Sequence, residues 1–214
     1  NFVFQSALFM ENKNYQEDLQ HIRKMMEKSS RFISLSGISG VFAGLFALAG
    51  AIYVYFFFKK NGVDYFEGTV KYYEKDFIVH LVIVAMVVMV LAISSGAYFT
   101  IKKSKAHHLQ IWDATTKKLL YNFAIPLGIG GLFCAGLLYH GLHGLLSPAT
   151  LIFYGLALFN AGNYTFSDIK YLGLCEMALG IVSLFFLGYG LFFWAIGFGV
   201  LHIVYGIVMH KKYK

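Results

Sequence analysis

Long apolar stretches alternate with short polar connections along most of the chain. Six of these stretches approach the length that crosses the hydrocarbon core of a bilayer, for which roughly 20 residues suffice. They lie at 32–58, 78–101, 119–141, 149–162, 171–187 and 190–209. The runs are continuous and do not alternate residue by residue, so they predict helices and not the strands of a membrane barrel. We therefore expect an all-α polytopic membrane protein with a six-helix transmembrane bundle.

The chain before the first apolar stretch divides into two parts. Residues 1–9 contain the string Asn-Phe-Val-Phe-Gln-Ser, which matches the tag-removal protease site Asn-Leu-Tyr-Phe-Gln-Ser at four of six positions. We expect this part to be left over from expression, with Met10 as the natural start. Residues 10–31 are polar with apolar positions at helical spacing, which predicts an amphipathic cytoplasmic helix. Residues 32–210 then form the transmembrane domain.

The composition and the distribution of charge agree with a membrane location. Hydrophobic residues make up 58% of the chain and charged residues 14%, whereas a soluble domain has about 25% charged residues. The net charge is +7, but fourteen of the eighteen Lys and Arg residues lie on one predicted side, in the N-terminal segment, the 102–118 loop, the loop before the fifth stretch and the tail. This is the positive-inside distribution and not a nucleic-acid footprint. We expect a protein of the bacterial inner (cytoplasmic) membrane with both termini cytoplasmic.

Two ionisable residues, Glu176 and His202, lie inside the last two apolar stretches. An ionisable group at that depth costs about 2.5 kcal/mol or more, so it usually faces a polar interior and marks a site. Other polar side chains fall at a similar depth in the cytoplasmic half: Asn160, Ser94, Ser95, Asn122 and Tyr205. The pattern predicts a cytoplasm-facing cavity that binds a small molecule, lipid or ion. The alternative is a satisfied structural pair, in which a neutral Glu176 or a hydrogen bond between Glu176 and His202 staples two helices.

Histidines on the predicted outer side form a second group. His140 and His143 are three residues apart, so they share a face if their helix continues through Gly141, and His80 lies at the outer end of the second stretch. Imidazoles at such spacing can bind zinc or another transition metal, and His80 with His140 would suit the two axial positions of a haem. Interfacial histidines without a ligand are commoner, so we predict no cofactor.

No motif in the chain identifies a reaction. The Walker loop, the Gly-x-Ser-x-Gly string and the paired His-rich motifs of di-iron membrane oxygenases are missing. We therefore expect a non-enzymatic transporter, channel or sensor subunit whose partners are membrane lipids. Two alternatives stay open: an intramembrane enzyme with Glu176 and His202 as its acid–base pair, and a scaffold or homo-oligomer that pairs through residues 11–31.

Three parts of the chain resemble a family of uncharacterised bacterial inner-membrane proteins with six helices. They are Arg31–Gly37, Leu151–Gly155 with Leu172–Gly180, and Ala195–Gly206. The resemblance covers most of residues 15–210. It implies a six-helix membrane fold and no biochemical activity.

Overall fold

The computed structural model describes residues 36–62, 74–106 and 111–213. The predictions for residues 1–9 and for an amphipathic helix at 10–31 lie outside these residues. Within the described ranges the chain is helical and contains no strand. The expected all-α class is therefore confirmed for this part of the chain.

The helices follow the apolar stretches closely. The long ones are α2 (Gly37–Lys60), α3 (Lys75–Ala106), α4 (Ala114–Tyr139), α5 (Leu146–Ala161), α6 (Asp168–Leu184) and α8 (His202–Lys212). The shorter ones are the 3-10 turns η2 (His143–Leu145) and η3 (Leu187–Tyr189), the helix α7 (Gly190–Trp194) and the π-helical segment η4 (Ala195–Leu201). The segments α7, η4 and α8 follow one another without a break, so the last apolar stretch is one helix with a π-helical middle.

Five helical segments of the described chain are long and apolar enough to cross a membrane. They are Gly37–Lys60, Lys75–Ala106, Ala114–Tyr139, His143–Ala161 and Leu187–Lys212. The remaining expected crossing corresponds to α6, which has 17 residues and is shorter than the roughly 20 residues of a typical span. The helical membrane-protein character predicted from hydropathy is confirmed at the level of these five segments.

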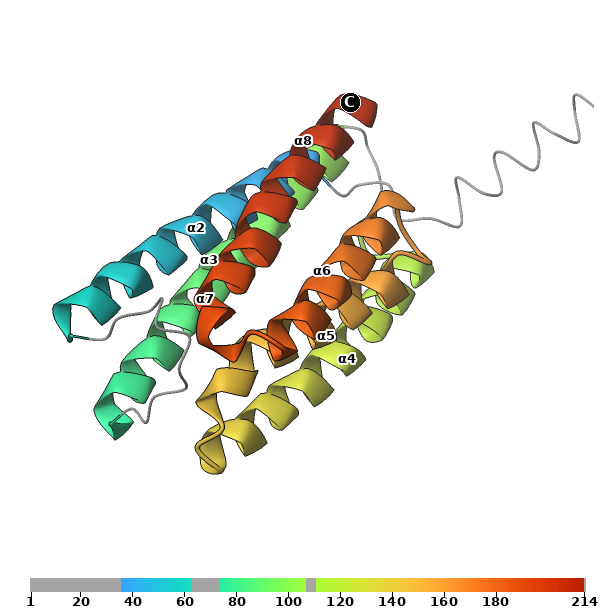
Figure 1. Ribbon diagram of the computed structural model, residues 1–214. Coiled ribbons are helices and arrows are strands. Elements are labelled where there is room, and N and C mark those ends of the chain that lie inside the picture. The colour runs from blue at the N-terminus through green and yellow to red at the C-terminus, as the bar shows by residue number, and fades with distance from the viewer. Residues whose placement is uncertain (1–35, 63–73, 107–110, 214) are drawn as a thin grey trace, which may run out of the picture.

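The long helices form two groups of three (Figure 1). In one group α2 packs against both α3 and α8, and in the other α5 packs against both α4 and α6. The groups meet mainly where α7 and η4 pass α5 and α6. A tight turn connects α6 to the continuous helix of α7, η4 and α8, but α6 and α8 belong to different groups, because α8 packs chiefly against α2.

Glycines allow the helices inside each group to approach closely. A Cβ on Gly206 of α8 would stand 2.7 Å from the carbonyl oxygen of Gly37 on α2. In the other group, a Cβ on Gly155 of α5 would stand 2.6 Å from the carbonyl oxygen of Gly173 on α6. Lipid tails are as apolar as a leucine side chain, so helices in a membrane associate through such close backbone packing and not through hydrophobic burial.

An apolar cluster joins the two groups near the start of α6 and the end of α8. We call its four buried members, which come from α5, α6 and α8, the inner cluster: Leu158, Ile169, Leu172 and Met209. Partly buried aromatic residues surround it, among them Phe166 and Tyr213. The inner cluster therefore fills the space between the groups at the end of the molecule that carries the C-terminal lysines.

Candidate functional site

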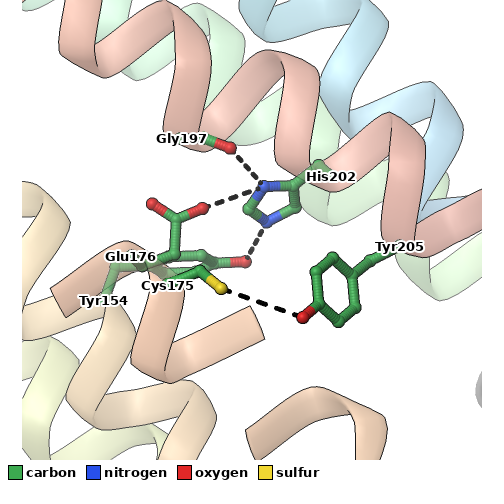
Figure 2. A network of polar contacts seen from close by, with 6 residues as sticks. All are labelled: Tyr154, Cys175, Glu176, Gly197, His202 and Tyr205. Atoms are coloured by element: carbon green, nitrogen blue, oxygen red, sulfur yellow. Dashed lines mark hydrogen bonds and ion pairs between the residues drawn. The ribbon is translucent and has the colours of Figure 1, made fainter. Parts of the chain in front are cut away.

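Glu176 and His202 meet where the two helix groups touch (Figure 2). Glu176 lies about two turns into α6, and His202 is the first residue of α8. The Oε1 atom of Glu176 lies 3.3 Å from Nδ1 of His202. Both residues are buried, with exposed fractions of 0% and 6%. The contact joins one helix group to the other through two ionisable side chains.

Both ring nitrogens of His202 have a partner. Nδ1 lies 3.0 Å from the carbonyl oxygen of Gly197, and Nε2 lies 2.8 Å from the hydroxyl oxygen of Tyr154 on α5. A carbonyl oxygen only accepts hydrogen bonds, so Nδ1 carries a proton and donates it to Gly197. Nε2 accepts from the tyrosine hydroxyl when the ring is neutral and donates to it when the ring is a cation. The imidazole is therefore held in place in either charge state.

The carboxyl group of Glu176 is the least satisfied polar group of this cluster. Neither of its oxygens makes a hydrogen bond of good geometry within the described residues. The 3.3 Å approach of Nδ1 lacks hydrogen-bond geometry, because the N–H of that nitrogen is directed to the carbonyl of Gly197, and it is an ion pair only when the imidazole is a cation and the carboxyl group is ionised. Buried polar groups are normally hydrogen-bonded, and each exception calls for an explanation; the hydroxyls of Ser104 and Ser183 share this property with Glu176 in the described residues. Of the two forms of staple that we considered from the sequence, the direct hydrogen bond between Glu176 and His202 is not formed in the described residues, and a neutral Glu176 stays a prediction.

Gly197 provides the space that the carboxyl group occupies. A Cβ at this position would collide with Oε2 of Glu176 and would stand 2.5 Å from Cδ2 of Leu151. Gly197 belongs to the π-helical segment η4, which leads directly into His202. Such π-helical turns are rare and occur often at functional sites. Here the π-helical segment supplies the carbonyl of Gly197, to which Nδ1 of His202 is bonded.

Two members of the cluster, Tyr154 and Cys175, escaped the sequence analysis. The Sγ atom of Cys175 lies 3.8 Å from the hydroxyl oxygen of Tyr205, which gives Tyr205 a contact to α6. A signal for Tyr154 was present, because it lies three residues after Leu151 and four before Leu158, and both leucines are buried. A tyrosine on the buried face of a helix requires a partner for its hydroxyl group.

Four other predicted site residues lie apart from this cluster. Ser94 is exposed on α3, and Asn160 is half-buried near the end of α5. Ser95 and Asn122 each donate to a carbonyl oxygen about one turn earlier in their own helix, at 2.9 Å and 2.8 Å. In the described part of the chain, none of the four forms a hydrogen bond with Glu176 or His202. Of the predicted set, only Glu176 and His202 contact each other; Tyr205 contacts Cys175, the neighbour of Glu176 in the sequence.

The polar residues around Glu176 and His202 are covered on the side of the molecule that carries the C-terminal lysines. Asp168, at the start of α6, accepts from Lys212 at 3.1 Å and from the hydroxyl of Tyr213 at 2.5 Å. We call these three residues the inner latch. Burial raises the pKa of the Asp168 carboxyl, but the bonds from Tyr213 and Lys212 outweigh it and hold that pKa below its ordinary value. The inner cluster and the inner latch together separate Glu176 from this end of the molecule.

The outer histidines are divided between two places. His80 faces α2, where its ring stacks on Phe57 with centroids 4.2 Å apart and its Nε2 atom lies 2.9 Å from the hydroxyl oxygen of Tyr53. His140 and His143 lie beyond the end of α4. Among the described residues, no three His, Cys, Asp or Glu side chains come together as a metal-binding group.

The helix does not continue through Gly141, so the idea that His140 and His143 share one helix face is wrong. Gly141 has a φ of 69°, in the left-handed region that glycine adopts without strain. Its N–H bonds to the carbonyl of Leu138, and the N–H of Leu142 bonds to that of Leu137. These two bonds form the Schellman motif that ends a helix.

No protein-family profile, curated protein or solved structure matches this chain. The resemblance to six-helix inner-membrane proteins rests on the strings quoted above. What the protein does must therefore be argued from the cluster of Glu176, His202 and Tyr154.

Proposed function

We propose that this chain is a non-enzymatic integral membrane protein that binds a proton or a small polar cation between its two helix groups. The binding residues are Glu176, His202 and Tyr154, which we call the polar junction. The observation that carries the proposal is the buried carboxyl group of Glu176, which has no hydrogen bond of good geometry in the described chain. A bound cation or proton would supply the missing partner.

Six crossings with both termini in the cytoplasm of a bacterial cell complete the proposed topology. As the additional crossing, α6 would span about 25 Å at 1.5 Å per residue, close to the hydrocarbon thickness of about 30 Å. Lys103, near the end of α3, donates to the carbonyl of Tyr213 at 3.2 Å. This bond supports a common side for the lysine-rich end of α3 and the C-terminus, as the positive-inside rule requires.

Access to the polar junction would come from movement of one helix group against the other. Glu176 is fully buried, so a ligand reaches it only when its surroundings open. The inner latch and the inner cluster are the contacts that would separate on the proposed cytoplasmic side. Packed helix groups with a small mutual interface commonly move as bodies about such contacts.

A purely structural junction is the second candidate, because complete burial of Glu176 also suits a fixed contact. An enzyme is disfavoured, because catalysis requires an electrophile or cofactor beside the two ionisable groups, and no motif in the sequence identifies a reaction. The two candidates differ in whether the charge of Glu176 responds to pH or to a ligand.

The test is the melting temperature of the detergent-purified protein between pH 5 and pH 9, with and without sodium, potassium, choline or spermidine. Wild type is compared with Glu176→Gln, which keeps the shape of the side chain but cannot ionise. We expect a pH-dependent or cation-dependent stability in the wild type that Glu176→Gln lacks.

Glu74→Gln is the matched control, because Glu74 is an exposed glutamate just before α3. It should behave as the wild type does. If wild type and Glu176→Gln differ by the same amount at every pH and with every cation, the polar junction is structural and the binding proposal fails.

A further inference from the structure

A second hollow lies far from the polar junction, between the start of α3 and the end of α4. These helices belong to different groups, with α3 packed on α2 and α4 on α5, so they leave a gap between them. The gap is a cleft of about 550 Å³, within the range of about 300–1,000 Å³ that is usual for ligand sites. We call it the α3–α4 cleft.

The lining of the cleft changes from polar to apolar along α3. Lys75, His140 and His143 lie at the end where α3 starts and α4 stops. Deeper along α3 the wall is aliphatic: Ile78, Val79, Val82 and Ile83. One end therefore offers an ammonium group and imidazole N–H donors, and the other offers only hydrocarbon. This gradient matches an amphiphile that has one polar head and an apolar chain.

The polar end suits an anion better than a metal ion. Imidazoles alone are metal ligands, but the ammonium group of Lys75 in the same wall would repel a divalent cation. Lysine and histidine N–H groups are instead good donors to phosphate oxygens. Glu74 and Asp76 flank Lys75 in the sequence, but neighbouring residues of a helix point about 100° apart, and neither lines the cleft.

The turn after α4 brings the two histidines to the cleft. Because the Schellman turn at Gly141 reverses the chain, His143 returns beside His140 at the start of η2. A non-glycine residue at position 141 would have to adopt a φ that is strained for it. The local sequence thus builds the polar end of the cleft at the boundary of two crossings.

We propose that the α3–α4 cleft binds one anionic phospholipid from the surrounding bilayer. Its phosphate lies among Lys75, His140 and His143, and one acyl chain follows the aliphatic wall of α3. The outward faces of both helices support a lipid as the source, since Val82 and Ile83 are exposed by 38% and 55% in segments that are long and apolar enough to cross a membrane. The proposal is independent of the polar junction.

The test is native mass spectrometry of the protein with matched phosphatidylglycerol or phosphatidylcholine, counting the lipids that remain bound. We expect the wild type to retain one phosphatidylglycerol in preference to phosphatidylcholine. In the triple variant Lys75→Gln, His140→Gln, His143→Gln, the ratio of retained phosphatidylglycerol to retained phosphatidylcholine should fall about tenfold, because the variant removes charge-assisted hydrogen bonds to the phosphate. Val82→Trp, which fills the apolar part of the cleft, should reduce the retention of both lipids.

Lys60→Gln is the control, because Lys60 is an exposed lysine at the end of α2 that lies outside the cleft lining. It should retain lipid as the wild type does. Equal retention of the two lipids by the wild type, or an unchanged preference in the triple variant, overturns the proposal. Stabilisation by zinc chloride alone that is lost in His140→Gln would also overturn it, in favour of a metal site. Circular dichroism of each variant separates lost binding from lost folding.

Discussion

The carboxyl group of Glu176 occupies the space that a side chain at Gly197 would fill. Glu176 belongs to α6 and Gly197 to the π-helical segment η4, so the two residues come from different helix groups. The missing side chain at Gly197 lets an ionisable group enter the contact between the groups. The carbonyl of the same glycine accepts the Nδ1–H of His202, so one residue both admits the carboxyl group and orients its partner.

Gly197→Ala should destabilise the protein by about 1–3 kcal/mol, the usual cost of an extra methyl group in a filled site. The added Cβ would displace Oε2 of Glu176 and press on Leu151, which is fully buried. Thermal unfolding in detergent measures the change. Gly96→Ala is the control, since a Cβ there meets nothing within 4 Å, and alanine should be neutral or slightly stabilising in a helix. Equal stability of the two variants would contradict the packing that we describe.

Tyr154→Phe should lower the free energy of unfolding by about 1–3 kcal/mol, because it leaves the buried Nε2 atom of His202 without its hydrogen-bond partner at 2.8 Å. The ring contacts of Tyr154 with Phe198 and His202 stay possible in the phenylalanine variant. The measurement is again thermal unfolding. Tyr121→Phe serves as the reference, because Tyr121 is 68% exposed. If Tyr154→Phe lowers the stability no more than Tyr121→Phe does, the hydrogen bond to His202 does not contribute as described.

Asp113→Ala should destabilise α4 by about 1 kcal/mol through loss of its N-cap. Asp113 Oδ1 accepts from both the hydroxyl and the backbone N–H of Thr116 at 2.7 Å, and these bonds hold the pKa of its carboxyl below the ordinary value. Because the pKa is lowered in the folded protein, the stabilisation is complete at neutral pH and is lost as the pH falls below about 4.

The pH dependence of this cap is measured by comparing Asp113→Asn with the wild type. Asparagine keeps an oxygen that can cap the helix but carries no charge. The stability difference between the two proteins should shrink as the pH is lowered from 7 to about 3. A constant difference over this range would show that the charge of Asp113 contributes nothing.

Opening of the inner latch should increase the exposure of Cys175, which is half-buried in the closed structure and contacts Tyr205 of the other helix group. Asp168→Asn weakens the bonds from Lys212 and Tyr213, so we expect a polar thiol reagent to modify Cys175 about tenfold faster. Cys134→Ser is used as the background, because Cys134 is the other free cysteine. Mass spectrometry of the labelled protein gives the rate.

Asp76→Asn provides the matched control for the latch, because it removes an exposed aspartate from the opposite end of the helices. It should leave the labelling rate unchanged. An equal rate in Asp168→Asn and wild type would mean that the inner latch does not control access to the space around Cys175.

The positions of the helices were predictable because hydropathy is a local property. Each apolar stretch became a helix within a few residues of its expected ends. The stop of α4 before Gly141 was not predicted, because it depends on the backbone conformation of that glycine. The presence of Glu176 and His202 inside apolar stretches was equally visible in the sequence. Their environment was not, because it depends on which helices pack together.

One wrong grouping and one overlooked residue illustrate the difference between the position of a side chain along its helix and its environment. We grouped Ser94, Ser95, Asn122 and Asn160 with Glu176 by their depth, but depth does not say which way a side chain points or which helix it faces. Conversely, Tyr154 looked like one aromatic residue among many, and only the packing of α5 against η4 and α8 brought its hydroxyl group to His202.

The sequence alone established the helical membrane class, the approximate ends of the helices and the two ionisable residues inside apolar stretches. It could do so because the length and hydropathy of a helix are properties of that segment by itself. The tertiary structure decided the division into two helix groups, the pairing of Glu176 with His202 across them and the cleft between α3 and α4. These features depend on contacts between segments far apart in the chain. Such contacts are selected by the fit of whole helix surfaces, with glycines such as Gly197 and Gly206 setting where the backbones come close.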